Sequence, residues 1–310
     1  MVASHNQRMP SRCILCLQNP PIQNSHIVPK FMIKRLKEGS PLRTLVHSNM
    51  LNRVFQDGWK EDYLCNGCEQ RFSRLEHWFC QNVYEPFLAG AQLSLKYGNE
   101  LGLFICSLGF RYIRYALDKN PSQPCAPELS VMYQNLRTGL LNDSLANIPA
   151  HPYIQFLFPI PSIDQFPPGI NTYLFESIDG AVFSHILPSG KLWLVYLKVP
   201  SLFFILSSGN LRHAFRPSCV LDSHEVLDQG QLNSQPGSGA LFSLVHDTLC
   251  DRALEIQANY SKMPAGRAEK MASKIAAVPN KAAYRAHQTY LLDMKLISEL
   301  EANHAKGPTG

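Results

Sequence analysis

The 310-residue chain lacks the long, uncharged apolar run that a membrane-spanning helix requires. Its best candidate stretch, residues 101–117, is interrupted by Arg111 and Arg114. Residues 1–10 also lack the apolar core that a secretory signal needs. These absences predict a cytoplasmic protein with no membrane partner.

Charged residues are scarce as well, at 17% of the chain, whereas hydrophobic residues make up 45%. This balance excludes a disordered chain and supplies enough apolar side chains for a sizeable core. The sequence has no internal repeat, no glycine-rich phosphate-binding loop and no Ser-His-Asp arrangement for acyl transfer. A folded, soluble protein with a different kind of site is therefore expected.

The net charge of +5 is concentrated near the amino terminus. Residues 1–80 hold 11 Lys and Arg against 6 Asp and Glu, whereas residues 81–310 hold 18 of each kind. Because phosphate contacts supply most nonspecific affinity for nucleic acids, this excess favours a polyanionic partner. On charge alone, a solvated surface is an equally good interpretation.

Hydrophobic periodicity predicts an α+β fold. Helices are expected over residues 27–36, 70–87, 100–118 and 129–141, with a loop at 124–128. Short runs rich in Val, Ile, Phe and Tyr are typical of strands, and they occupy residues 153–158, 172–176, 181–187, 192–199 and 202–206. The sequence Pro188-Ser189-Gly190 predicts a hairpin turn, and hence an antiparallel sheet.

The nine cysteines are an odd number, which argues against a complete set of disulfides. Two C-x-x-C pairs stand out, Cys13 with Cys16 and Cys65 with Cys68. Four thiolates match the tetrahedral coordination of zinc, so these residues predict a structural Zn²⁺ site. The other five show no paired spacing and are expected to be small buried hydrophobes: Cys80, Cys106, Cys125, Cys219 and Cys250.

The residues between the two cysteine pairs, and those that follow the second pair, resemble motifs of a known family. Between the pairs lies Ser25-His26-Ile27-Val28-Pro29, and the second pair continues as Cys68-Glu69-Gln70-Arg71-Phe72-Ser73-Arg74-Leu75-Glu76. Over residues 11–80 this order resembles the HNH endonucleases, and the particular motifs look like those of a bacterial branch of that family. The resemblance implies a treble-clef (ββα-metal) zinc module that hydrolyses phosphodiester bonds, with DNA favoured over RNA. It also implies that His26 is the general base and that a divalent cation, Mg²⁺ or Mn²⁺, acts at the scissile phosphate.

Three positions depart from the family pattern. Ser25 stands where members usually carry an acidic residue or a second His, and Lys60 stands where they tend to have Asn. Glu69 replaces the His or Asn that commonly follows the second pair. Since hard cations favour oxygen ligands, Glu69 remains a candidate ligand of the catalytic cation. The departures equally suit a catalytically inactive zinc module that recognises nucleic acid or protein.

Glu76 is a further catalytic candidate on the same expected helix. It lies seven residues after Glu69, about 10 Å along a helix, so one ion does not bind both carboxylates unaided. Glu76 is alternatively a partner for Arg35, Arg71 or His77. The basic residues near the module are the candidate nucleic-acid contacts, namely Lys30, Lys34, Arg35, Lys37, Lys60 and Arg71.

These observations predict three regions. Residues 1–98 form the HNH-like zinc module, and residues 99–228 form a domain of helix and antiparallel sheet. Residues 229–240, which contain several glycines, form a linker to a helical region at 241–310.

Overall fold

A computed structural model of the protein describes residues 11–39, 45–47, 50–89, 94–146, 148, 151–156, 183–189, 192–199, 202–209 and 226–228, together with residues 251, 266 and 269. The chain divides into two compact units. Unit 1 consists of residues 1–29, 59–157 and 183–242, and unit 2 consists of residues 30–58, 158–182 and 243–310. Helices and antiparallel sheets occur together, which confirms the predicted α+β class.

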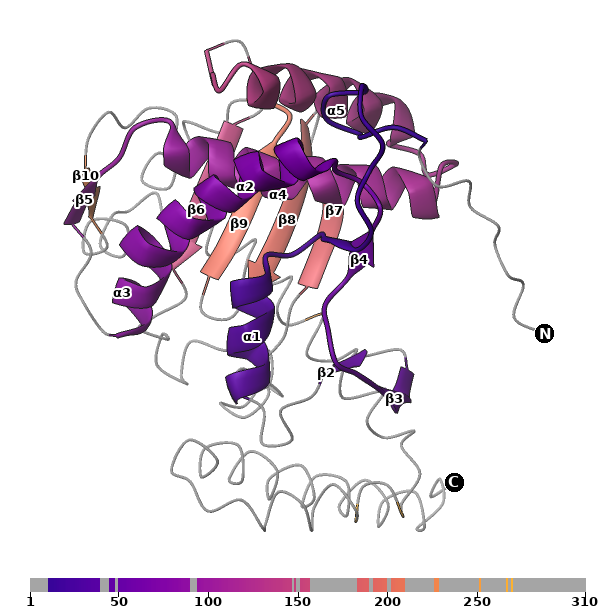
Figure 1. Ribbon diagram of the computed structural model, residues 1–310, viewed down its shortest axis with the longest axis vertical. Coiled ribbons are helices and arrows are strands. Elements are labelled where there is room, and N and C mark those ends of the chain that lie inside the picture. Colours follow the sequence, from indigo (N-terminus) through magenta and orange to yellow (C-terminus); the bar gives the residue numbers. More distant parts are fainter. Residues whose placement is uncertain are drawn as a thin grey trace, which may run out of the picture. The chain divides into compact units, whose positions relative to one another are not determined.

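Unit 1 contains most of the described elements (Figure 1). In chain order they are β1 (Ser25–His26), β4 (Lys60–Glu61), α2 (Asn66–Phe79), a π-helical turn (Cys80–Tyr84), α3 (Glu85–Leu88), β5 (Ser94–Lys96), α4 (Glu100–Lys119), α5 (Ala126–Leu141), β6 (His151–Phe156), β7 (Phe183–Ser189), β8 (Leu192–Val199), β9 (Leu202–Ser207) and β10 (Val226–Asp228). The cysteine pairs and His26 therefore lie within one unit.

The main sheet of unit 1 is antiparallel, with strand order β6-β9-β8-β7. Strand β7 pairs with β8 from Phe183 opposite Lys198 to Ser189 opposite Leu192. The predicted antiparallel sheet is thus confirmed, but Pro188 and Ser189, which were predicted to lie in the turn, belong to β7 and pair with Trp193 and Leu192. The strand predicted at 172–176 and the linker at 229–240 lie outside the described residues, as does the carboxy-terminal helical region apart from residues 251, 266 and 269.

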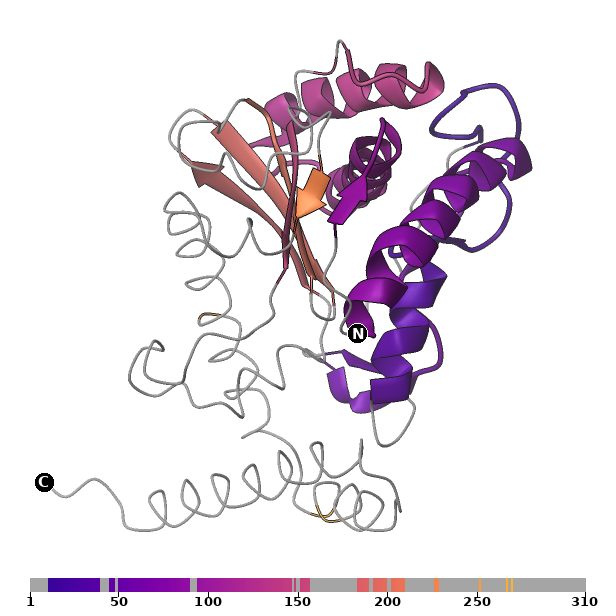
Figure 2. The same ribbon diagram turned by 90° about the vertical axis from the view of Figure 1, so that its left-hand side faces the viewer.

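Helix α4 forms the centre of unit 1. Its residues from Leu101 to Arg111 are all buried, and it contacts α2, α5 and strands β6, β8 and β9. Figures 1 and 2 show α4 running between the sheet on one side and α2 on the other. Phe104 of α4 stacks on Phe79 of α2 with ring centroids 4.1 Å apart, and it meets Phe204 of β9 edge-on at 5.8 Å. Segments on both sides of residue 98 therefore share one core.

The observed helix ends correct several predicted boundaries. The helix expected at 70–87 is one helical run that begins earlier, with α2 at Asn66, and passes through the π-helical turn into α3. The expected loop at 124–128 is partly helical, because Pro127 occupies the first turn of α5, where its missing N–H costs nothing.

Unit 2 contains α1 (Lys30–Gly39) and the antiparallel strands β2 (Leu45–His47) and β3 (Met50–Phe55). Helix α1 begins after Pro29 rather than at Ile27, because the residue before a proline disfavours helical geometry. Gly58 lies directly against the Ile33 side chain, where a Cβ atom would clash. Lys37 donates a hydrogen bond to the carbonyl oxygen of Gln56 at 2.9 Å.

In the part of the chain that the structure describes, no helix combines the length and the apolar character needed to cross a membrane.

Candidate zinc centre and the polar cluster beside it

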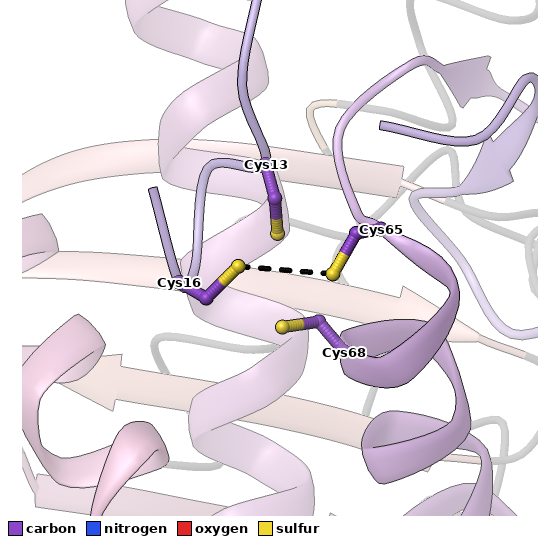
Figure 3. A group of neighbouring side chains, drawn as sticks. All are labelled: Cys13, Cys16, Cys65 and Cys68. Carbon is purple, nitrogen blue, oxygen red and sulfur yellow. Dashed lines mark hydrogen bonds between the residues drawn. The ribbon is translucent and has the colours of Figure 1, made fainter. Parts of the chain in front are cut away.

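The four predicted zinc ligands converge in unit 1. The sulfur atoms of Cys13, Cys16, Cys65 and Cys68 all lie within 4.8 Å of one another, and they point toward a common centre (Figure 3). A Zn–S distance of about 2.3 Å places each pair of sulfurs in a tetrahedron about 3.8 Å apart. The Sγ atoms of Cys16 and Cys65 are 3.7 Å apart, which fits this geometry. The cluster can therefore hold a metal ion such as zinc.

Backbone hydrogen bonds shape the first cysteine loop. The amide of Leu17 donates to the carbonyl of Cys13 at 2.9 Å, and Leu17 adopts a left-handed φ of 59° that turns the chain. The amide of Cys13 donates to the carbonyl of Asn19 at 2.7 Å. The loop is joined to the second pair through the amide of Ile14, which donates to the carbonyl of Tyr63 at 2.8 Å.

The second cysteine pair begins a helix. Cys65 is the residue before α2, and Cys68 lies in its first turn, so helix geometry fixes the separation of the two thiols. The amide of Glu69 donates to the carbonyl of Cys65 at 2.9 Å, which starts the helical hydrogen-bond pattern.

The local environment lowers the pKa of one thiol of the cysteine centre and raises the pKa of two others. Burial acts to raise the pKa of Cys16, but hydrogen bonds from the backbone amides of Asn19 and Gln18 outweigh it and lower the value to about 6. Burial raises the pKa of both Cys13 and Cys68. Because a bound cation stabilises thiolates directly, a metal ion would offset this desolvation.

Helix α5 anchors the first cysteine loop from outside. The Tyr133 hydroxyl donates to the carbonyl of Ile14 at 3.0 Å, and Arg137 Nε donates to the carbonyl of Leu15 at 2.6 Å. Both acceptors lie between Cys13 and Cys16. The packing of α5 therefore supports the geometry of the cysteine centre.

The remaining described cysteines follow the prediction in part. All seven described cysteines are free thiols, and Cys106 and Cys125 are buried as expected. Cys80 is only half-buried, with its Sγ atom 3.6 Å from a carboxylate oxygen of Glu85. Cys219 and Cys250 lie outside the described residues.

A polar cluster adjoins the cysteine centre where β1 and β4 pair. His26 lies directly opposite Lys60, and Ser25 lies opposite Glu61. Ser25 is buried with 2% of its surface exposed, whereas His26 is half-buried. The backbone amide of Leu64 approaches the Ser25 hydroxyl oxygen at 3.4 Å, just before the second cysteine pair.

Arg111 of α4 joins this cluster from the core. It is only 1% exposed, and its Nη1 atom donates both to the carbonyl oxygen of His26 at 2.9 Å and to Glu76 Oε1 at 2.8 Å. Its Nε atom donates to the carbonyl of Ser107 at 3.2 Å, and its guanidinium carbon lies 5.3 Å from the centre of the Phe72 ring. One side chain thus links β1, α2 and α4.

Glu69 lies in the first turn of α2, as predicted, and is half-buried. Burial raises the pKa of its carboxyl group, while the charge of Arg111 opposes the shift and the charge of Glu76 adds to it. Its Oε2 atom is buried and has no hydrogen-bond partner. A buried carboxylate oxygen without a partner is costly, so a bound cation or water is expected there.

The structure also corrects the expected partner of Glu76. Neither Arg71 nor His77 pairs with this carboxylate, because Arg111 binds it from another helix. Arg71 instead donates to the carbonyl oxygens of Leu140 and Leu141 at 3.0 and 2.8 Å, and it pairs with Asp143 at 3.1 Å. Arg71 is therefore committed to the end of α5.

The other basic candidates are divided between the two units. Lys60 lies in unit 1 opposite His26. Lys30, Lys34, Arg35 and Lys37 lie on α1 in unit 2. Lys30, Lys34 and Arg35 are exposed, and Lys34 forms a surface ion pair with Glu38 at 3.7 Å.

Sequence reasoning missed Arg111 as a residue of the site. The available signal was its position on an otherwise apolar helical stripe with Phe104 and Leu108, where a charged residue needs a buried partner. Which partner it would find was not readable, because Glu76 and His26 lie 35 and 85 residues away along the chain.

Within the described ranges, the four cysteines are the only group of three or more His, Cys, Asp and Glu ligands placed to hold a metal ion. Comparison with known proteins found no matching family model, no matching curated protein and no matching solved structure.

Proposed function

We propose that this protein is an HNH-like, metal-dependent endonuclease that hydrolyses phosphodiester bonds of nucleic acid, with DNA favoured. One observation carries the proposal. His26 lies on β1, whose partner strand β4 precedes α2, the helix that carries Cys68, and it shares a polar cluster with the Glu69 Oε2 atom, which has no hydrogen-bond partner. The pairing of β1 with β4, and the position of α2 directly after β4, support the proposal of a treble-clef, or ββα-metal, module.

The proposed reaction uses His26 as the general base. The neutral imidazole accepts a proton from a water molecule while the water oxygen attacks phosphorus. The new P–O bond forms as the bond from phosphorus to the leaving oxygen breaks, and that oxygen is finally protonated. The products are a phosphate monoester end and a hydroxyl end.

The same site offers one carboxylate oxygen for a catalytic cation. Mg²⁺ is usually held by one or two carboxylates, with water and substrate phosphate completing its coordination, so Glu69 alone is an adequate protein ligand. A cation bound there would stabilise the negative charge that develops on the phosphate oxygens. Glu76 is less suited to this role, because Arg111 already pairs with it at 2.8 Å.

Nucleic-acid binding is proposed for Lys60 and for the basic residues of α1. Lys60 lies across the strand pair from His26, which suits a phosphate contact near the reacting group. Lys30, Lys34 and Arg35 are exposed on α1, which begins four residues after His26 along the chain. Each lysine that contacts a phosphate should lower the slope of log affinity against log salt by about 0.9.

The test is a cleavage and binding assay of the full, zinc-loaded chain. Plasmid, linear and single-stranded DNA and RNA are each incubated with Mg²⁺, Mn²⁺ or EDTA. Cleavage that requires the added cation and is lost in Glu69→Gln supports the endonuclease. The matched control is Glu128→Gln, an exposed glutamate in the first turn of α5, which should cleave like wild type.

A zinc-stabilised binding module is the second candidate. The ion pair between Arg111 and Glu76 favours this function, because it makes the Glu76 carboxylate less able to bind a catalytic cation. The described residues also contain no second group of three or more potential metal ligands besides the four cysteines. This function predicts salt-sensitive binding without cleavage under every cation condition. In that case the Lys30→Gln and Lys34→Gln variants should still weaken binding.

A further inference from the structure

We propose that Arg111 is a positioning residue for His26, and that its ion pair with Glu76 leaves Glu69 as the working carboxylate of the site. The inference rests on the function proposed above. It concerns a residue outside the resemblance, which ends near residue 80, and it assigns different roles to the two acidic residues of α2.

The first step is the contact between Arg111 and the backbone of His26. Strand β1 contains only Ser25 and His26, so few ladder hydrogen bonds hold it. The next amide, that of Ile27, donates to the carbonyl of Trp59 at 2.9 Å. The bond from Arg111 Nη1 to the His26 carbonyl, at 2.9 Å, is therefore a substantial part of what fixes this backbone.

The second step is the rigidity of the guanidinium itself. Arg111 Nε is held by the carbonyl of Ser107 one turn earlier in α4, and the group lies over the Phe72 ring. With 1% of its surface exposed, Arg111 does not reach a bound phosphate. It acts through the groups that it holds, which makes it a positioning residue rather than a catalytic one.

The third step concerns the different hydrogen bonding of the Glu69 and Glu76 carboxylates. Arg111 Nη1 contacts Glu76 Oε1 and the His26 carbonyl together, so the charge of Glu76 is compensated and its oxygen is oriented toward α4. Glu69 Oε2 has no partner inside the protein. A cation would gain more from a carboxylate oxygen that has no hydrogen-bond partner than from one that already forms an ion pair with arginine at 2.8 Å.

Arg111→Lys is the informative substitution, because lysine keeps the positive charge but loses the planar group that contacts Ser107, His26 and Glu76 together. Arg114→Lys is its matched control. Arg114 lies on the same helix, and its ion pair with Asp118, at 2.7 Å, involves neither β1 nor α2.

The first measurement reads the His26 carbonyl directly and needs no activity. Histidine labelled with carbonyl-13C and isoleucine labelled with 15N give correlated signals only where His precedes Ile, and the sequence contains two such pairs, His26-Ile27 and His185-Ile186. The Ile186→Val variant assigns the signals, because it removes one of them. We expect Arg111→Lys to move the His26 signal upfield and to leave the His185 signal unchanged, whereas Arg114→Lys moves neither.

The second measurement separates positioning from folding. At equal zinc content, Arg111→Lys should lower kcat by about 10²-fold, as misplacement of a catalytic group does, with KM for DNA within about threefold of wild type. Should Arg111→Lys fail to fold, Glu69→Gln and Glu76→Gln still test the division of roles. Glu69→Gln should lower kcat by the larger factor.

Three results would overturn the inference. They are an unchanged His26 signal in Arg111→Lys, a kcat no lower than that of Arg114→Lys, and a larger loss of kcat in Glu76→Gln than in Glu69→Gln. A wild-type protein that cleaves nothing would instead refute the proposed function. The carbonyl signal would then still decide whether Arg111 holds His26.

Discussion

The cysteine centre and the Arg111 cluster, which consists of Arg111 with His26 and Glu76, both lie in unit 1. They differ in how the sequence specifies them. The cysteine centre takes its ligands from two short motifs, and a loop and the start of α2 set the spacing within each motif. The Arg111 cluster joins β1, α2 and α4, whose contributing residues are 35 and 85 positions apart. Local spacing specifies the first site, whereas the packing of α4 against α2 specifies the second.

The two sites also differ in what supports them. The cysteine centre can hold a cation, which would offset the desolvation of its buried thiols, and it is further held by α5 through Ile14 and Leu15. The Arg111 cluster contains its own positive charge, which is buried and partly paired. Removing metal should therefore act directly on the first site, whereas the charge pairing of the second site is removed directly only by mutation.

The largest expected effect is loss of the cysteine centre. Cys68→Ala should abolish zinc binding and unfold the segment around α2, because structural zinc contributes about 10–16 kcal/mol of apparent binding energy in small zinc domains. Zinc content and thermal melting of the full chain measure this. Cys106→Ala is the control, since Cys106 is fully buried but stands outside the cluster. Equal zinc content in wild type and Cys68→Ala would refute the assigned ligand set.

The next effect is on the Arg111 cluster. Arg111→Met should lower the free energy of unfolding by about 3–5 kcal/mol, because it leaves the carboxylate of Glu76 without its buried partner. Arg114→Met should cost about 1 kcal/mol or less, since that ion pair is partly exposed. Urea unfolding at saturating zinc compares the two. Similar losses in both variants would show that the cluster does not depend on Arg111.

A smaller effect is expected where α5 ends. A Cβ atom on Gly139 would collide with the Ile148 side chain and come within 2.9 Å of the Ser144 carbonyl oxygen. Gly139→Ala should therefore cost about 1–3 kcal/mol through overpacking. Gly67→Ala has open space around its Cβ position on α2, so it should be neutral or stabilise by up to about 1 kcal/mol. Thermal melting of both variants checks the pair, and a destabilised Gly67→Ala would contradict the described packing.

The smallest effect concerns the link from α5 to the first cysteine loop. Tyr133→Phe keeps the ring that stacks on Phe110 at 4.7 Å but removes the hydroxyl that donates to Ile14. We expect a loss of about 1 kcal/mol and faster amide exchange in residues 13–17, with zinc still bound. Unchanged exchange in that loop would mean that α5 does not support the cysteine centre.

Much of the fold was accessible from the sequence where patterns are local. The four cysteines, the antiparallel strands β7 and β8, and the helix at 100–118 were all predicted, because spacing and periodicity act over a few residues. The sequence pattern predicts the start of α5 too late, at residue 129, because Pro127 is as typical of a loop as of the first helical turn, where the structure has it. The predicted partner of Glu76 was wrong, because tertiary packing, and not local sequence, brings Arg111 to this carboxylate.

The candidate site was also predictable from the sequence where it depends on local motifs, but not where it depends on tertiary packing. His26 and Glu69 were chosen from their motifs, and the structure brings both beside Arg111. The sequence favoured Glu69 as the cation ligand from its position directly after the second cysteine pair, but it did not show that Arg111 would pair with Glu76. The distinction depends on which carboxylate oxygen finds a partner, and that partner, Arg111, lies on α4, 35 residues along the chain from Glu76.

Cleavage of DNA by zinc-loaded wild type, His26→Ala and His77→Ala at matched zinc content is the most direct test of the account. His77 is the control, because it is an exposed histidine of α2 in its last turn. The account predicts cation-dependent cleavage by wild type and His77→Ala, and its loss in His26→Ala with zinc content unchanged. Cleavage by His26→Ala at the wild-type rate would contradict the assignment of His26 as the general base. No cleavage by any of the three, together with salt-sensitive binding of DNA, would favour the binding module instead.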